Sequence, residues 1–339
     1  MMNSTTANQE CKVPPGTIIS GKWHGNQYQI IKPLGHGANG VVYLAKGKAG
    51  YSALKLSENS MSITSEVNVL KHFSKVRDSS LGPFLHDVDD WLKPGRSSAI
   101  AFYAMEYIQG PAYLDFIKGK GSEWISVLVI QLLSSLEQLH MGGWIFGDLK
   151  PDNLIVSSSP VKLRFVDVGG TTQKGRAIKE FTDFFDRGYW GMGNRKADAG
   201  YDLFAVAMII INSAYPKRFS RNGEGKQLLF RKIEEHPYLK KHKRLLQKAL
   251  CGEYINAEEM RVDLIRNLKY EEKTVRAPVK KQVSVNKQTS PAQSNHSAAP
   301  KRRAQKRKRK RITGFLDAVL VLTGLFVLYM LYIYHFLLP

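Results

Sequence analysis

Acidic, basic and amide side chains gather in one short stretch of the sequence, between two apolar runs. Asp148, Lys150 and Asn153 stand there at positions i, i+2 and i+5, and Asp167 ends the next strand-like run, 161–166. The oxygen atoms of aspartate and asparagine are hard ligands that suit Mg²⁺, and Mg²⁺ in turn bridges nucleotide phosphates. The pattern therefore favours metal-assisted chemistry on a phosphate, with Asn153 and Asp167 as candidate ligands of the cation.

A glycine-rich stretch lies nearer the start of the chain. Gly35, Gly37 and Gly40 follow a strand-like pattern that begins at Tyr28. Glycine lets a backbone turn tightly and approach phosphates without a clash at Cβ. A strand-like run, rather than a helix, follows the glycines, so the spacing disfavours a dinucleotide-binding fingerprint. Taken alone, the stretch is equally compatible with a simple glycine-rich hairpin.

A lysine interrupts the next apolar stretch. Lys55 lies inside a strand-like run, where a charged side chain on the core side is costly unless it is paired. The expected helix 61–73 carries its apolar residues on one face, and Glu66 borders that face. A pair between Lys55 and Glu66 would hold the lysine ready for a phosphate. Two separate, solvated surface charges are the alternative.

Taken in chain order, these motifs resemble the Hanks-type (eukaryotic-like) Ser/Thr protein kinases over residues 28–270. Within that family, the stretches that start at Ser65, Gly143 and Tyr201 are most similar to a small bacterial kinase with a C-terminal membrane helix. The resemblance implies an α+β, bilobal protein-kinase-like fold. It also implies ATP-dependent transfer of phosphate to Ser or Thr of protein substrates, including the kinase itself.

The resemblance assigns catalytic roles to individual residues. Lys55 would bind the α- and β-phosphates and pair with Glu66, while Lys150 would steady the transferring phosphoryl group. Asp148 would accept or orient the proton of the substrate hydroxyl, and Asp202 would hydrogen-bond back to the catalytic loop. Phosphoryl transfer depends mainly on in-line positioning and on cations around the spreading negative charge, and these residue types supply both.

ATP and Mg²⁺ are the cofactors that the resemblance implies. Asn153 and Asp167 would hold Mg²⁺. In the hinge between the lobes, the carbonyl of Glu106 and the backbone of Ile108 would contact the adenine edge. The residues expected around the nucleotide are Leu34, Gly35, His36, Gly37, Ala38, Asn39, Gly40, Val41, Val42, Ala53, Lys55, Met105, Glu106 and Ile108.

The sequence departs from the family pattern next to the catalytic aspartate. Phe146 and Gly147 stand where the family has His and Arg, and that arginine normally receives the phosphate of the activation loop. We therefore expect that activity does not depend on such an ion pair, although Thr171, Thr172 and Thr182 remain candidate phosphorylation sites. The Ala-Pro-Glu motif that normally ends the activation segment is not recognisable, which leaves the docking of peptide substrates open.

Three other functions stay open at the level of sequence. A small-molecule phosphotransferase of kinase-like fold would explain Gly147, but such enzymes usually lack the lysine that stands here at Lys150. A pseudokinase is disfavoured because the lysine, the glutamate, the catalytic aspartate and both metal ligands are all present. A membrane-tethered nucleic-acid-binding protein with an incidental kinase domain would require these residues to be dispensable.

Composition divides the chain into a folded part and a C-terminal tail. The predicted parts are a polar N-terminal segment at 1–24, a kinase domain at 25–273 with an N-lobe at 25–108 and a C-lobe at 109–273, a flexible, disordered basic linker at 274–312 and one transmembrane helix at 313–338. Within the last segment, residues 318–338 hold no Asp, Glu, Lys or Arg and are apolar all round, and a helix of that length matches the thickness of a bilayer core. A buried core helix is the alternative. Two cysteines in 339 residues exclude a disulfide scaffold.

Positive charge is concentrated in the linker. The chain has a formal net charge of +21, and residues 274–311 contribute 13 Lys and Arg without an acidic residue. Beside a membrane helix such a run stays on the cytoplasmic side, which predicts a single-pass protein of the cell membrane with a cytoplasmic kinase domain. An anionic membrane surface is one expected partner of the run, and duplex DNA bound without sequence specificity is another. The basic residues concerned are Lys301, Arg302, Arg303, Lys306, Arg307, Lys308, Arg309, Lys310 and Arg311.

Overall fold

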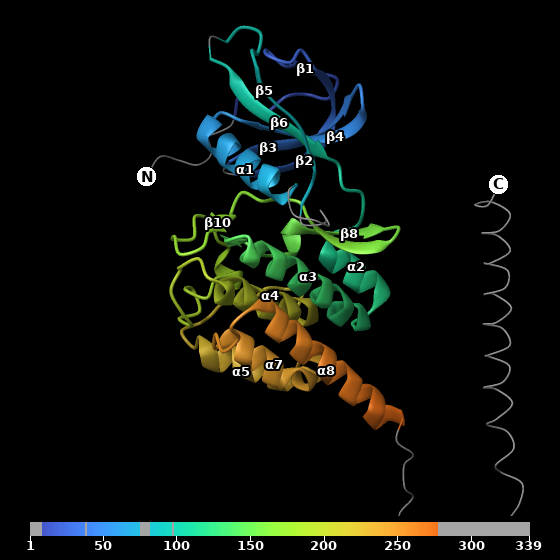
Figure 1. Cartoon of the computed structure of the whole chain (residues 1–339), viewed down its shortest axis with the longest axis vertical. Coiled ribbons are helices and arrows are strands. Elements are labelled where there is room, and N and C mark those ends of the chain that lie inside the picture. The colour runs from blue at the N-terminus through green and yellow to red at the C-terminus, as the bar shows by residue number, and fades with distance from the viewer. Residues whose placement is uncertain (1–8, 38, 75–81, 97, 277–339) are drawn as a thin grey trace, which may run out of the picture. The chain divides into compact units, whose positions relative to one another are not determined.

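A computed structural model of the chain describes residues 9–37, 39–74, 82–96 and 98–276, which form two lobes (Figure 1). The predicted basic run and transmembrane helix lie outside the described residues, as do Ala38 and most of the predicted linker. Within the described part of the chain, no helix is both long and apolar enough to cross a bilayer. The predicted α+β, bilobal fold is confirmed.

The smaller lobe is built on a six-stranded antiparallel sheet in the order β1-β2-β3-β4-β6-β5. Its elements are β1 (Ile18–Ser20), β2 (Gln27–Gly37), β3 (Gly40–Gly47), β4 (Gly50–Ser57), α1 (Ser60–Phe73), β5 (Leu85–Trp91) and β6 (Ile100–Glu106). Asn59 caps the start of α1, because its side chain accepts the backbone N–H groups of Met61 and Ser62. The buried face of α1 packs on the sheet and carries Glu66.

The N-terminal residues contribute to the core of this lobe. Cys11 and Ile19 are fully buried in the same apolar cluster as Val41 and Phe102. The hydroxyl of Tyr43 donates to the carbonyl of Cys11 at 3.0 Å. Part of the segment that appeared simply polar in sequence therefore packs on the sheet, on the side of Val41.

The larger lobe is mainly helical and also contains two two-stranded antiparallel sheets, β7 with β10 and β8 with β9. Its elements are α2 (Tyr113–Lys120), α3 (Glu123–Met141), β7 (Trp144–Ile145), a 3₁₀ turn (Pro151–Asn153), β8 (Leu154–Ser158), β9 (Val161–Phe165), β10 (Thr172–Gln173), a second 3₁₀ turn (Asp183–Phe185), α4 (Ala199–Ala214), α5 (Lys226–Glu235), α6 (Pro237–Lys241), α7 (Lys243–Leu250) and α8 (Ala257–Arg276). Residues 201–212 of α4 are all buried, as its nearly unbroken apolar sequence predicts. The chemically important residues lie at strand ends: Asp148 follows β7, and Asp167 follows β9.

Candidate active site

The structure brings Lys55 and Glu66 together in the smaller lobe. Lys55 is on β4, Glu66 is on α1, and Nζ of the lysine lies 2.6 Å from Oε2 of the glutamate. Both side chains are buried, at 8% and 2% exposure, so they are not the solvated surface charges of the alternative interpretation. Burial alone would lower the pKa of Lys55, but the carboxylates of Asp167 and Glu66 outweigh it and raise that pKa. Lys55 is therefore a fixed cation at the edge of the cleft.

Two hydroxyl groups that the sequence reasoning did not single out support the same glutamate. Tyr103 on β6 donates to Oε2 of Glu66 at 2.7 Å, and Ser62 donates to Oε1 at 3.1 Å. Burial and the neighbouring Glu66 raise the pKa of Tyr103 well above its ordinary value, so Tyr103 stays a donor. Tyr103 faces Lys55 directly in the register of β4 and β6, and that cross-strand pairing is the signal that could have found it.

In the catalytic loop, Asp148 and Lys150 contact each other and share a third partner. Nζ of Lys150 donates to Oδ2 of Asp148. The hydroxyl of Thr182 donates to Oδ1 of Asp148 at 3.0 Å and accepts from Lys150 at 3.1 Å. Sequence reasoning named Thr182 only as a phosphorylation candidate. The structure makes it the link between the activation segment and the catalytic pair.

Hydrogen bonds to α4 fix the backbone of the catalytic loop. Asp202 accepts the N–H groups of Phe146 at 2.8 Å and Gly147 at 2.9 Å, as predicted, and it also contacts Nε2 of His140. Gly147 has a φ of +83°, and a Cβ added there would lie 2.6 Å from the carbonyl oxygen of Gly170. A left-handed conformation and a close backbone approach both favour glycine at this position.

Asn153 and Asp167, the expected Mg²⁺ ligands, line one cleft. The side-chain amide of Asn153 donates to the carbonyl of Asp148 at 2.9 Å, which uses its nitrogen and leaves its oxygen available. Asp167 accepts the N–H of Gly169 at 2.9 Å. Two hard oxygen donors in the same cleft as the buried Lys55 fit Mg²⁺ with nucleotide phosphates.

The cleft has a volume of about 410 Å³, which is within the usual range for small-molecule sites. The predicted residues that line it are Leu34, Gly35, Val42, Ala53, Lys55, Met105, Glu106, Ile108, Asn153 and Asp167. His36, Gly37, Asn39, Gly40 and Val41 do not line it, and Ala38 lies outside the described residues. Val41 belongs to the apolar cluster that contains Cys11, because successive side chains of β3 point to opposite faces of the sheet.

The side chain of Glu106 has a role that the sequence reasoning did not assign. Only its carbonyl was expected to take part, in contact with adenine. The structure pairs its carboxylate with Arg164 on β9, at 2.8 Å, and the same guanidinium donates to the carbonyl of Gly82 at 2.9 Å. The hinge is thereby tied to a strand of the larger lobe.

A buried aspartate, Asp186, anchors the activation segment. Asp186 is fully buried and accepts Nε of Arg195 at 2.9 Å and the hydroxyl of Tyr201 at 2.9 Å. Thr171 and Thr172 are buried, at 1% and 0% exposure, so they are poor phosphate acceptors in this conformation.

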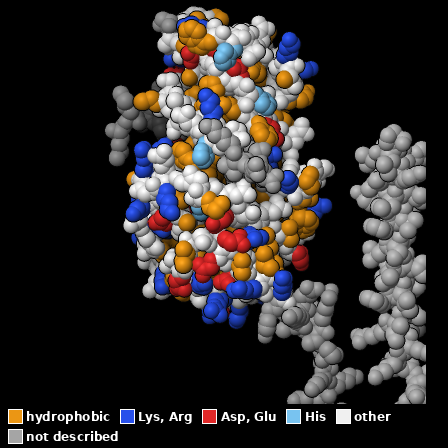
Figure 2. Space-filling view, viewed as in Figure 1, with side chains coloured by type: hydrophobic (Ala, Val, Ile, Leu, Met, Phe, Trp, Pro, Cys, Tyr) orange, Lys and Arg blue, Asp and Glu red, His pale blue; other side chains and the backbone are white. Residues whose placement is uncertain are grey.

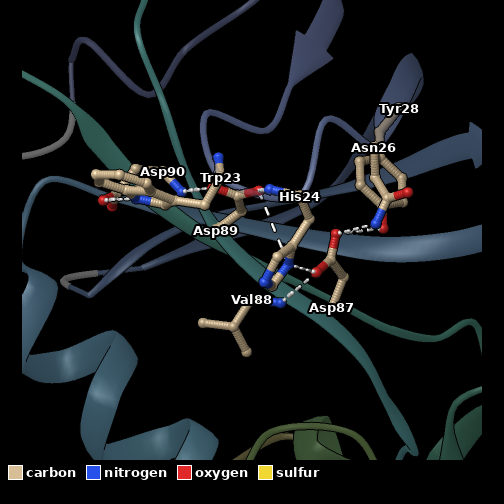
Figure 3. Close-up of polar contacts among 8 residues, drawn as sticks. All are labelled: Trp23, His24, Asn26, Tyr28, Asp87, Val88, Asp89 and Asp90. Carbon is tan, nitrogen blue, oxygen red and sulfur yellow. Dashed lines mark hydrogen bonds and ion pairs between the residues drawn. The ribbon is translucent and has the colours of Figure 1, made fainter.

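One group of side chains outside the cleft has the spacing of a metal site among the residues that the structure describes: His24, Asp87 and Asp89 (Figure 3). Nδ1 of His24 lies 2.7 Å from Asp87, which also accepts Asn26 and Tyr28. Asp89 accepts the backbone N–H groups of residues 23, 24 and 90. Because both carboxylates already have several donors, we interpret the group as a clamp that fixes the turn after β1 to β5.

Acidic and basic side chains are interspersed over the end of the larger lobe that carries α5–α7 (Figure 2). Glu234 pairs with Lys240 at 3.7 Å and also with Lys243. This pairing partly balances the positive charge of both lysines within the larger lobe.

The site and the fold together define a protein kinase. The family model described as "Protein kinase domain" matches residues 28–285. The chain therefore belongs to the protein kinase family, and within it to the Hanks-type Ser/Thr kinases.

Individual relatives agree with this assignment. The chain is 48% identical to the serine/threonine-protein kinase YabT of Bacillus subtilis, over 99% of this chain and 100% of that protein. It is 28% identical to a probable serine/threonine-protein kinase of Clostridium perfringens, over 44% of this chain and 22% of the other. Among solved structures, vaccinia related kinase 3 matches with a TM-score of 0.55 at 15% identity, over 77% of this chain and 92% of that one, a likeness that shows the fold alone.

Proposed function

We propose that this kinase transfers the γ-phosphoryl group of MgATP to Ser and Thr hydroxyls of proteins, including other copies of itself, at the cytoplasmic face of the cell membrane. The observation that carries the proposal is the link between the buried Lys55–Glu66 pair and the Asp148–Lys150 pair. Asn153 lines the same cleft as Lys55 and donates to the backbone carbonyl of Asp148. The identity to YabT over the full length of both proteins supports a protein substrate rather than a small molecule.

Bound MgATP supplies the phosphoryl group, and the chain supplies charge and position. Lys55, held by Glu66, is the cation for the phosphates. Asp148 accepts the proton of the incoming hydroxyl, and Lys150 lies beside it to balance negative charge on the transferring group. Because Thr182 and Asp202 hold this loop from two sides, little rearrangement is needed when the substrate arrives.

A transfer assay with γ-labelled ATP tests the proposal. The chain is presented with itself and with a generic basic protein, and Asp148→Asn and Lys55→Met are compared with the wild type. Asp115→Asn and Lys71→Met are matched controls, because both residues are exposed and neither lines the cleft. We expect label to disappear in the first two variants only. ATP binding without label on any protein would instead favour a small-molecule phosphotransferase.

The membrane location is part of the proposal and is supported by sequence alone. Residues 318–338 hold no Asp, Glu, Lys or Arg, and nine basic residues in 301–311 precede them, which is the order expected of a cytoplasmic domain on a C-terminal anchor. Cell fractionation of the full chain and of 1–312 tests this. We expect only the full chain to resist extraction from membranes by alkaline carbonate.

We further propose that the 301–311 run binds anionic lipid and, in addition, duplex DNA through its phosphates, and that such binding gathers copies for phosphorylation between them. Autophosphorylation of 1–312 is compared with and without duplex DNA, and with and without phosphatidylserine vesicles, at two salt concentrations. Stimulation that falls with salt is the expected result. No DNA effect at low salt would reject the DNA role and leave the lipid role.

A further inference from the structure

One acidic residue of the activation segment contacts the glycine-rich turn of the smaller lobe. Oε1 of Glu180 accepts a hydrogen bond from Nδ2 of Asn39, which lies between β2 and β3. Its neighbour Lys179 donates to Ser65 of α1 at 3.2 Å. A short stretch that also includes Thr182 therefore touches α1, the glycine-rich turn and the catalytic loop.

Glu180 also belongs to the electrostatic environment of the phosphate site. Burial raises its pKa and so do the carboxylates of Asp167 and Glu66, while Asn39 and Lys55 act in the opposite direction. Conversely, Glu180 is one of the carboxylates that raise the pKa of Lys55. The negative charge of Glu180 thus interacts electrostatically with the cation and with the metal ligand that nucleotide phosphates would use.

We propose that Glu180 is a positioning residue that limits the affinity for nucleotide phosphates. While it holds Asn39, the glycine-rich turn is tied to the activation segment and a carboxylate stands beside the place of the phosphates. Binding of MgATP must loosen this contact and overcome the repulsion. The inference rests on the proposed binding of MgATP in this cleft, but not on the identity of the protein substrate.

The experiment measures equilibrium binding to the full chain purified in detergent, with a non-hydrolysable MgATP analogue and with adenosine. Glu180→Ala removes both the contact and the charge, and Glu180→Gln removes the charge while it keeps an acceptor for Asn39. Asp183→Ala and Asp183→Asn are matched controls, because Asp183 is an exposed acid of the same segment. Adenosine has no phosphates and reports whether the adenine end of the cleft has changed.

We expect Glu180→Ala to bind the MgATP analogue about 3- to 10-fold more tightly, the factor that corresponds to one hydrogen bond of ordinary net strength. Glu180→Gln should show a smaller gain, and adenosine affinity and both Asp183 variants should match the wild type. Unchanged or weaker binding of the analogue by both Glu180 variants would overturn the inference, and so would an equal gain for adenosine. A wild-type chain that binds adenosine but not the analogue would refute the proposed function itself.

Discussion

Removal of Lys55 is expected to destabilise the protein as well as inactivate it, and the two effects can be separated. In Lys55→Met, Glu66 remains as a carboxylate with 2% exposure and without its cation. Breaking a buried ion pair from one side typically costs about 3–5 kcal/mol. Tyr103 and Ser62 still donate to Glu66, so we expect the lower end of that range, about 3 kcal/mol of unfolding free energy.

The second substitution removes the charge that the first one leaves unpaired. Tyr103 and Ser62 contact different oxygens of Glu66, so in Lys55→Met/Glu66→Gln one hydroxyl can donate to the amide oxygen and the other can accept from the amide N–H. We expect the double variant to recover at least about half of the stability that Lys55→Met loses, because no unpaired charge remains buried. Activity should not recover, because the phosphates still lack their cation.

Urea unfolding followed by tryptophan fluorescence gives the free energies, and the labelled-ATP assay gives the activities. Lys71→Met, an exposed lysine of α1, controls for the loss of a positive charge on the same lobe. Additive losses in the double variant would refute the reasoning, since they would show that the pair is not coupled. A Lys55→Met variant as stable as the wild type would refute it equally.

Further predictions concern the support of the catalytic loop and the clamp of the smaller lobe. Gly147→Ala should lower kcat at least about 10-fold, because the added Cβ would lie 2.6 Å from a backbone oxygen. Gly175→Ala is the control: Gly175 has a φ of +91° and nothing near its Cβ, so this variant should lose stability without the same loss of kcat. Equal kcat values in the two variants would contradict the steric argument. Thr182→Ala should lower kcat by a larger factor than it raises the KM for ATP, and Thr182→Ser, which keeps the hydroxyl, should retain the wild-type kcat. A serine variant with a kcat as low as that of the alanine variant would show that catalysis does not depend on the hydroxyl. The hydrogen bond with Asp87 raises the pKa of His24 from its ordinary value of 6.5. The stability that the charged His24 contributes is therefore fully present below pH 6.5, and it disappears as the pH rises through the folded-state pKa. His24→Gln should therefore lower the melting temperature most between pH 4 and 6, where Asp87 is ionised and His24 is charged. A difference in melting temperature between variant and wild type that grows toward pH 9 would contradict this prediction.

The sequence was sufficient to predict residues whose role depends on local order along the chain. Asp148, Lys150 and Asn153 lie within one loop, and the glycine-rich stretch is a single hairpin, so spacing alone brings their members near one another. The Lys55–Glu66 pair needed only a strand followed directly by a helix. The order of these motifs carried the resemblance to the Hanks-type kinases, and that resemblance implied the two-lobed fold.

Contacts between distant segments were not predictable in the same way. Glu106 and Arg164 are 58 positions apart, and Thr182 is 34 positions from Asp148. No periodicity of helix or strand relates such positions, so only the assembled lobes reveal the partners. The burial of Cys11 was missed for a related reason, since a short polar stretch gives little sign of the few side chains that reach the core.

Gly147 shows how a correct observation can suggest the wrong cause. In sequence it marks the absence of an arginine and raises the possibility of a small-molecule substrate. In the structure, its left-handed backbone faces Gly170, and a Cβ on Gly170 would in turn lie 2.8 Å from Cβ of Asp148. The two glycines let the catalytic loop and the start of the activation segment approach more closely than any side chain would permit. Glycine at this position is therefore explained by packing around Asp148, and it carries no information about the size of the phosphate acceptor.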